Sequence, residues 1–123
     1  MSSLRRTLDG DVRIHHLTQD QRLIDPALLA RHGRSARTLV KEGPLRLTIV
    51  AIGAGGTLPS HRTAGPITIH VLEGEVTVSA LEQEYALGAS DVLVLGPGVE
   101  HAARSALGGV FLLTVVHRDS DAL

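Results

Sequence analysis

The chain has 123 residues, enough for one domain with a buried core. Its 12 Lys and Arg residues nearly balance 13 Asp and Glu residues, so we expect neither nucleic acid nor a charged membrane surface as a partner. The absence of cysteine excludes disulfides and thiolate metal sites. The first ten residues contain no apolar stretch that could serve as a signal peptide, and we expect a cytoplasmic protein.

The N-terminal part of the chain predicts one short helix. Asp25 is placed to be its N-cap, Pro26 its first helical residue and Gly33 its end. His32 directly precedes Gly33, where a cation would favourably meet the C-terminal end of the helix. From residue 36 the pattern becomes strand-like, so we expect an N-terminal extension, residues 1–35, packed on one barrel domain, residues 36–123.

Short strands separated by turn signals fill the rest of the chain. We expect strands at 38–40, 45–49, 67–72, 76–79, 84–87, 92–95 and 110–116, and a further one beginning at His101 after the turn of Gly96, Pro97 and Gly98. Residues 53–60 are expected to form a loop. Glu73 and Gly74 predict a hairpin turn, which would leave Glu75 solvated. Strands at this spacing are typical of an all-β sandwich or barrel.

Two stretches are similar to the paired motifs of the cupin superfamily. The first family pattern is Gly, five residues, His, one, His, three or four, Glu, six, Gly, and it falls on Gly55, His61, Thr63, Ile67 and Gly74. The second is Gly, five residues, Pro, one, Gly, two, His, three, Asn, and it falls on Ser90, Gly96, Gly98, His101 and Ser105. The spacing is kept, whereas several residues differ from the pattern. The resemblance implies an all-β fold, a cupin jelly-roll β-barrel with a short N-terminal helix, and a homodimer.

In the family, three histidines and a glutamate of these motifs converge on a divalent metal. Carried over position by position, only His61 and His101 remain ligands, because Thr63 is a poor ligand and Ile67 cannot coordinate a metal at all. The resemblance therefore implies a divalent ion (Zn, Ni, Mn or Fe) that is weakly bound or absent. His70 would add a third metal ligand only if a β-bulge turned it inward, since strict alternation from Ile67 sends it to the opposite face.

Two functions remain open, because a fold does not fix an activity. The first is a protein that binds a small molecule in an interior pocket, floored by Ile67, Ile69 and Val71 and oriented by His61, Thr63 and His101. The second is an enzyme that uses His61 and His101, either a metal-dependent oxygenase or a metal-free isomerase or lyase. A purely structural role for the two histidines, held by hydrogen bonds of the barrel, is the alternative to both.

Overall fold

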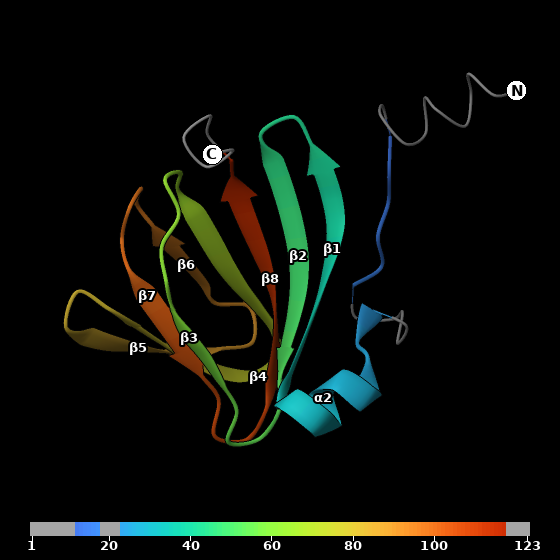
Figure 1. Cartoon of the computed structure of the whole chain (residues 1–123), viewed down its shortest axis with the longest axis vertical. Helices are drawn as coiled ribbons and strands as arrows, with labels where there is room; N and C mark the ends of the chain where they lie inside the picture. The colour runs from blue at the N-terminus through green and yellow to red at the C-terminus, as the bar shows by residue number, and fades with distance from the viewer. Residues whose placement is uncertain (1–11, 18–22, 118–123) are drawn as a thin grey trace, which may run out of the picture.

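The computed structural model describes residues 12–17 and 23–117. Within these residues the chain forms helix α2 and eight strands, which curl into an open barrel (Figure 1). Their bounds are α2 Pro26–His32, β1 Arg34–Glu42, β2 Leu45–Ile52, β3 Thr57–His61, β4 Ile67–Ala80, β5 Gln83–Gly88, β6 Val92–Leu95, β7 His101–Arg104 and β8 Gly109–Val116. No helix in this part of the chain is long and apolar enough to cross a membrane.

Helix α2 begins and ends at the residues that its sequence predicts. The Asp25 carboxylate accepts hydrogen bonds from the backbone N–H groups of Ala27 and Leu28, at 2.9 and 3.2 Å. At the other end, Gly33 adopts a left-handed conformation (φ +75°) and donates its N–H to the carbonyl of Leu29. Ser35, buried on β1, accepts a hydrogen bond from the Asp25 N–H and so ties the start of the helix to the sheet.

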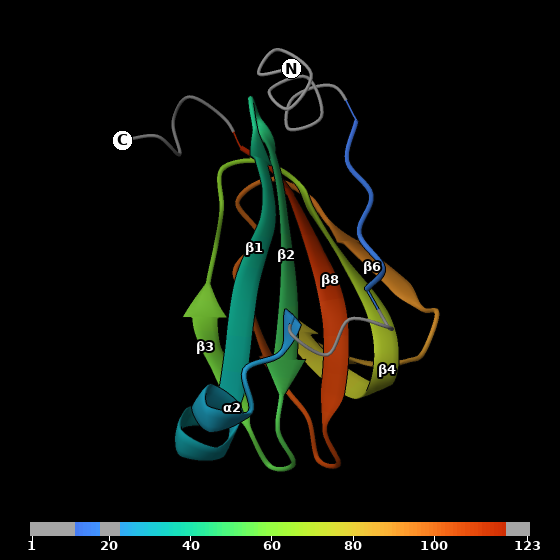
Figure 2. The ribbon, with the colours of Figure 1, turned by 90° about the vertical axis from the view of Figure 1, so that its right-hand side faces the viewer.

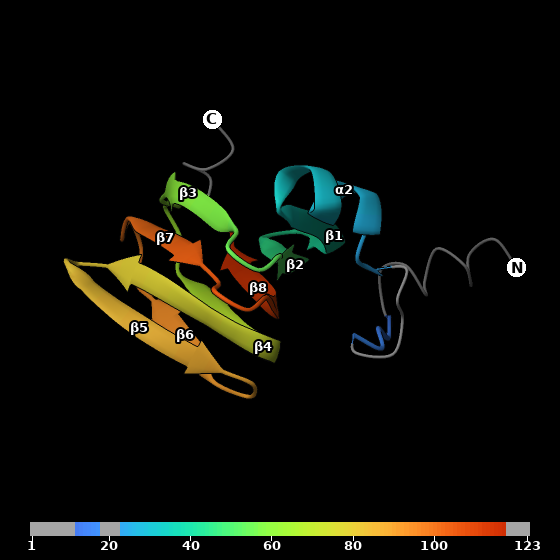
Figure 3. The same cartoon turned by 90° about the horizontal axis from the view of Figure 1, so that it is seen from below.

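The strands form one antiparallel path in the order β1-β2-β8-β4-β7-β3, and β5 and β6 also pair with β4. Seen from below, the path curves so that its concave side is enclosed between β1 and β2 on one side and β3 and β7 on the other (Figure 3). The predicted all-β barrel with a short N-terminal helix is confirmed, in the form of a curled half-barrel.

The predicted hairpin at Glu73 and Gly74 is wrong, because β4 runs through these residues without reversing. The first half of β4 pairs with β6 and β8, and its second half pairs with β5 and β7. Gly74 has a φ of +71°, and a Cβ placed on it would overlap with the carbonyl oxygen of Gly108. The glycine therefore permits close contact between β4 and the start of β8 rather than a chain reversal.

Residues 53–60 are only partly a loop, contrary to the expectation, since β3 begins at Thr57. β3 pairs with β7 in a register that places Leu58 opposite Ala103 and His61 opposite His101, with an irregularity between the two pairs. The strand is short and largely exposed, and it contains Pro59, so it lacks the alternating apolar pattern by which the other strands are predicted. β7 begins at His101, as predicted.

The main core fills the concave side of the sheet. Its buried residues alternate along β4, where Ile67, Ile69, Val71, Val76 and Val78 all point inward. The remaining members of this cluster are Val50, Ile52, Ala80, Leu95, Ala103 and Phe111. Ile49 and Ala51 are also buried, although they alternate on β2 with the inward-pointing residues.

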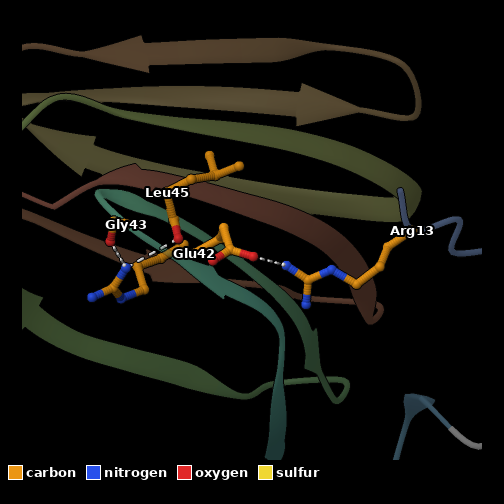
Figure 4. A network of polar contacts seen from close by, with 5 residues as sticks. Arg13, Glu42, Gly43 and Leu45 are labelled. Carbon is orange, nitrogen blue, oxygen red and sulfur yellow. Dashed lines mark hydrogen bonds and ion pairs between the residues drawn. The ribbon is translucent and has the colours of Figure 1, made fainter. Parts of the chain in front are cut away.

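The segment of residues 12–17 lies outside the barrel, on the side of β1, β2 and β8 that faces away from β3 (Figure 2). Arg13 of this segment donates to the Glu42 carboxylate at the end of β1, at 3.2 Å (Figure 4). Nearby, Arg46 Nη1 donates to the carbonyl oxygens of Gly43 and Leu45 and closes the turn between β1 and β2. Because the Arg13 ion pair is partly exposed, we expect it to position the segment and to contribute little to stability.

Gly74→Ala should destabilise the fold by about 3 kcal/mol or more, because the added Cβ meets the backbone of Gly108 and Gly109 at the crossing of β4 with the start of β8. Gly43→Ala is the matched control. Gly43 also has a positive φ, +54°, but no atom lies within 4 Å of the Cβ position, so the loss should be about 1 kcal/mol. Urea unfolding measures both changes. Equal losses in the two variants would show that the crossing tolerates a side chain.

Candidate functional site

The structure brings His61 and His101 together. They are directly opposed in the pairing of β3 with β7, and their ring centroids lie 5.6 Å apart with the ring planes at 68°. On its other side β7 pairs with β4, where His101 lies opposite the buried Ala80. Cross-strand partners share a face of a sheet, so His101 belongs to the concave face, at its rim. His101 is half-buried, and His61 is exposed.

A backbone hydrogen bond fixes the orientation of His101. Its Nδ1 lies 3.0 Å from the carbonyl oxygen of Val99, and a carbonyl can only accept. Nδ1 therefore carries the hydrogen, and the neutral ring has its lone pair on Nε2. That nitrogen is equipped to accept a hydrogen bond or a proton, or to coordinate a metal ion.

The other predicted pocket residues occupy two different environments. The Thr63 hydroxyl donates to the carbonyl of Gly65 at 2.9 Å, and the Thr63 carbonyl accepts from the N–H of Gly98 at 2.8 Å. Thr63 thus holds two turns together beside the histidine pair. Ile67 and Ile69 are buried in the main core, with 3% and 2% of their surface exposed.

His70 lies on the opposite face of β4 from the core. It is half-buried between the inward-pointing Ile69 and Val71, and its cross-strand partners are Val92 and Leu112. The register irregularity of β4 falls after Val71, so regular alternation applies from Ile67 through His70. The structure does not bring His70 to the histidine pair.

A cavity of about 500 Å³ opens on the concave side of the sheet, near α2. Its lining is chiefly apolar and also includes hydroxyl, imidazole and guanidinium groups. The lining residues are Leu28, His32, Arg34, Ser35, Ala36, Thr48, Val50, Leu58 and Leu113. Leu58 connects this cavity to the histidine pair, since Leu58 with Ala103 and His61 with His101 are successive register pairs of β3 and β7.

His101 also borders a second hollow, of about 510 Å³, whose lining includes more charged side chains. It lies beside the turn between β4 and β5 and includes Glu82, Glu84 and Glu100. Two of these carboxylates are engaged in surface contacts. Glu84 accepts from both terminal nitrogens of Arg104, at 2.6 and 3.0 Å, which lowers the Glu84 pKa. Glu100 accepts from the Ser60 hydroxyl at 2.8 Å and from Arg62 at 3.4 Å.

The family model described as "Cupin domain" matches residues 46–116, more than half of the chain. The chain belongs to the cupin family. No curated protein matches it.

Three solved structures are similar to this cupin in fold. A conserved protein of unknown function from Streptococcus pyogenes is 22% identical, with a TM-score of 0.68 over 86% of this chain and 92% of that one. An RmlC-like cupin from Shewanella frigidimarina is 23% identical, with a TM-score of 0.66 over 75% and 83%. Salicylate 1,2-dioxygenase from Pseudaminobacter salicylatoxidans is 18% identical, with a TM-score of 0.65 over 68% of this chain and 26% of that one. At these identities the likeness concerns the fold.

The donor set of this cupin does not fit a tightly held divalent metal ion. His61 and His101 supply two imidazoles, the Thr63 hydroxyl is engaged with Gly65, and Ile67 has no donor atom. Across residues 12–17 and 23–117, no group of three or more His, Cys, Asp or Glu side chains gathers in a way that could hold a metal. Protein sites that bind zinc or iron firmly supply at least three such ligands.

Ser105, the last position of the second motif, forms a buried network that the sequence pattern does not reveal. Its hydroxyl lies 2.7 Å from the Glu75 carbonyl oxygen and 2.8 Å from Glu75 Oε1, and it accepts from the N–H of Gly108 at 2.8 Å. The N–H groups of Ala106 and Leu107 also donate to Glu75 Oε1. Glu75 is therefore half-buried and hydrogen-bonded, and the expectation that it is solvated is wrong.

The same network holds the pKa of Glu75 below its usual value. The main cause is the hydrogen bond from the Leu107 N–H, followed by the Ser105 hydroxyl and, more weakly, the Ala106 N–H, while partial burial acts in the opposite direction. Ser105 further pairs through its backbone with Gly55 and Gly56, at 2.8 and 3.1 Å. The network thus ties the two motif regions together at the end of the barrel near α2.

Glu75→Gln should flatten the dependence of stability on pH in the acid range. Because folding lowers the pKa of Glu75, its contribution is fully present above the ordinary glutamate value near 4.5 and disappears as the pH falls through the lowered folded value. The variant should be less stable than the wild type at pH 7 and should lose less stability on acidification, as measured by urea unfolding from pH 7 to 3. Glu73→Gln, at an exposed position of the same strand, controls for the substitution. Parallel curves for the wild type and Glu75→Gln would contradict the prediction.

Thr63→His should strengthen Zn²⁺ or Ni²⁺ binding by about tenfold or more, because it adds a third imidazole to a two-donor site. Thr68→His is the control, since Thr68 lies on the face of β4 opposite the core. Calorimetric titration with each metal ion compares the two variants with the wild type. No gain in Thr63→His would mean that residue 63 does not face the histidine pair.

Proposed function

We propose that this cupin binds a small organic molecule, with the apolar part of the ligand in the concave cavity and a hydrogen-bonding group beside His61 and His101. The observation that carries the proposal is the adjacency of cavity and pair along β3 and β7. Leu58 lines the cavity, and the next register pair of the same two strands is His61 with His101. A ligand seated against Leu58 would therefore extend toward two imidazoles.

The size and lining of the cavity support this proposal. Its volume of about 500 Å³ falls within the range of small-molecule sites, roughly 300–1,000 Å³. Val50, Leu58 and Leu113 offer aliphatic surface, from which most of the affinity of a small ligand would come. A few polar groups then determine its orientation, and the His101 Nε2 is such a group because the Val99 carbonyl favours the tautomer that carries its hydrogen on Nδ1.

This proposal changes the role of two predicted pocket residues. Ile67 and Ile69 belong to the same core cluster as Val50, against which Leu58 and Leu113 pack. We assign the ligand contact to Val50, Leu58 and Leu113, and we assign to the two isoleucines the support of that surface from behind. Thr63 would act indirectly, through the turn that it holds against Gly98.

A metal-free isomerase or lyase is the second candidate function, favoured by the geometry of His101. A histidine whose Nδ1 donates to a carbonyl presents a basic Nε2, which could remove a proton from the carbon next to a ligand carbonyl and return it elsewhere. The oxygenase alternative has less support, because the site supplies no carboxylate to complete two histidines.

Phenol and toluene test the binding proposal, because they have similar size and only phenol can donate a hydrogen bond. Both should shift the NMR signals of the Val50, Leu58 and Leu113 methyl groups. His101→Ala should weaken phenol binding by about tenfold and change toluene binding by less than about twofold. His70→Ala, on the other face of β4, is the control. Methyl signals that respond to neither probe, or a His101→Ala variant with unchanged phenol affinity, would refute the proposal.

The same samples distinguish binding from catalysis. With cyclohexanone in deuterated water, a catalytic base would exchange the protons beside the carbonyl for deuterium faster than buffer does, and His101→Ala would abolish the excess. Occupancy of the cavity without excess exchange favours a binding protein.

A further inference from the structure

We infer that the ligand of this cupin carries an anionic head group, which Arg34 and His32 bind at the end of the cavity nearest α2. This inference rests on the proposed function and names the class of its ligand: an elongated apolar molecule with a carboxylate or comparable anion at one end and the hydrogen-bonding group at the other. Four observations support it, namely the position of the two basic side chains, the anchoring of Arg34, the charge of the lining and the length of the site.

The two basic residues come from adjacent elements that the chain connects by a single residue. His32 ends α2 and Arg34 begins β1, with Gly33 between them in a left-handed conformation. Both line the cavity. They lie at the same end because Gly33 turns the chain directly from the helix into the first strand.

A backbone contact anchors the Arg34 guanidinium across the opening of the barrel. Its Nη1 donates to the carbonyl oxygen of Thr57 at 3.3 Å. Arg34 lies on β1 and Thr57 on β3, which are the two ends of the strand path. This contact uses one of the five N–H groups of an arginine, and the planar guanidinium retains donors for an oxyanion.

The charge of the cavity favours an anion over a neutral or cationic ligand. Its lining includes Arg34 and His32 and no Asp or Glu, and its other members are apolar or carry hydroxyl groups. An uncharged ligand that covered Arg34 would remove the water that hydrates the guanidinium cation and would supply no negative charge in its place. The second hollow has the opposite character, since Glu82, Glu84 and Glu100 all line it.

The distance between the two polar ends determines the shape of the ligand. Thr57, which anchors Arg34, and His61 are four residue steps apart on β3, about 13 Å at the usual rise of a strand and about 10 Å if the irregularity removes one step. The apolar Leu58 lies between them. A medium-chain carboxylate with a hydrogen-bonding group at the far end of its chain has this form, with its carboxylate at Arg34 and the second polar group beside the histidine pair.

Octanoate and octan-1-ol are the probes that test this inference, because they share a tail and differ in the charge of the head. Methyl NMR titration should show both in the cavity, with octanoate the tighter. Arg34→Gln should weaken octanoate about tenfold and change octan-1-ol by less than about twofold. Arg37→Gln removes the same charge from the same strand, at a residue opposite Ile49, and should leave both affinities unchanged.

The outcomes separate the inference from the proposed function. Equal binding of the two probes, with octanoate insensitive to Arg34→Gln, would overturn the anionic head group and leave the cavity a ligand site. Absence of octan-1-ol from the cavity would overturn both. If Arg34→Gln does not fold, the salt dependence of binding to the wild-type protein tests the inference instead. Added salt should weaken octanoate and not octan-1-ol, and an equal response of the two would overturn the inference.

Discussion

The close crossing of β4 with the start of β8 is the constraint on which the rest of the structure depends. β4 is a single strand of 14 residues that pairs with β6 and β8 over its first half and with β5 and β7 over its second. It can change partners only because Gly74 and Gly109 let two backbones approach where side chains would collide. The Ser105 network then secures the loop that precedes β8 to Glu75, directly after the crossing. The two halves of the barrel therefore share one strand.

That shared strand also explains where the site forms. The second half of β4 pairs with β7, and β7 in turn pairs with β3. This pairing places His101 opposite His61 at the rim of the concave face. The first half of β4 supplies the buried isoleucines behind the cavity, while β1 and β2 close it from the other side. Relative to the family pattern, His61 and His101 are the two residues that remain at the positions of the metal ligands.

The sequence was sufficient to predict those elements that depend only on neighbouring residues. Asp25, Pro26 and Gly33 predict α2 to the residue, because a helix cap needs only its own neighbours. Gly74 misled the prediction because a glycine with positive φ is needed equally for a hairpin and for a close crossing, and only Gly109, far along the chain, decides between them. Motif spacing located His61 and His101. The cavity could not be predicted in the same way, since Val50, Leu58 and Leu113 come from three different strands. One of these strands, β3, contains Pro59 and lacks the alternating apolar pattern by which strands are predicted.

β3 gives the site a property of its own. It ends the strand path, pairs with β7 in the part of the chain that the structure describes, and contains a proline that has no N–H to donate. Such a strand detaches at a much lower free energy than the interior of the sheet, so its amides should exchange with solvent through local opening rather than global unfolding. His61 and the cavity-lining Leu58 lie on this strand and would move with it. Entry and release of the proposed ligand would then depend on local opening of this one edge strand, while the remainder of the barrel stays folded.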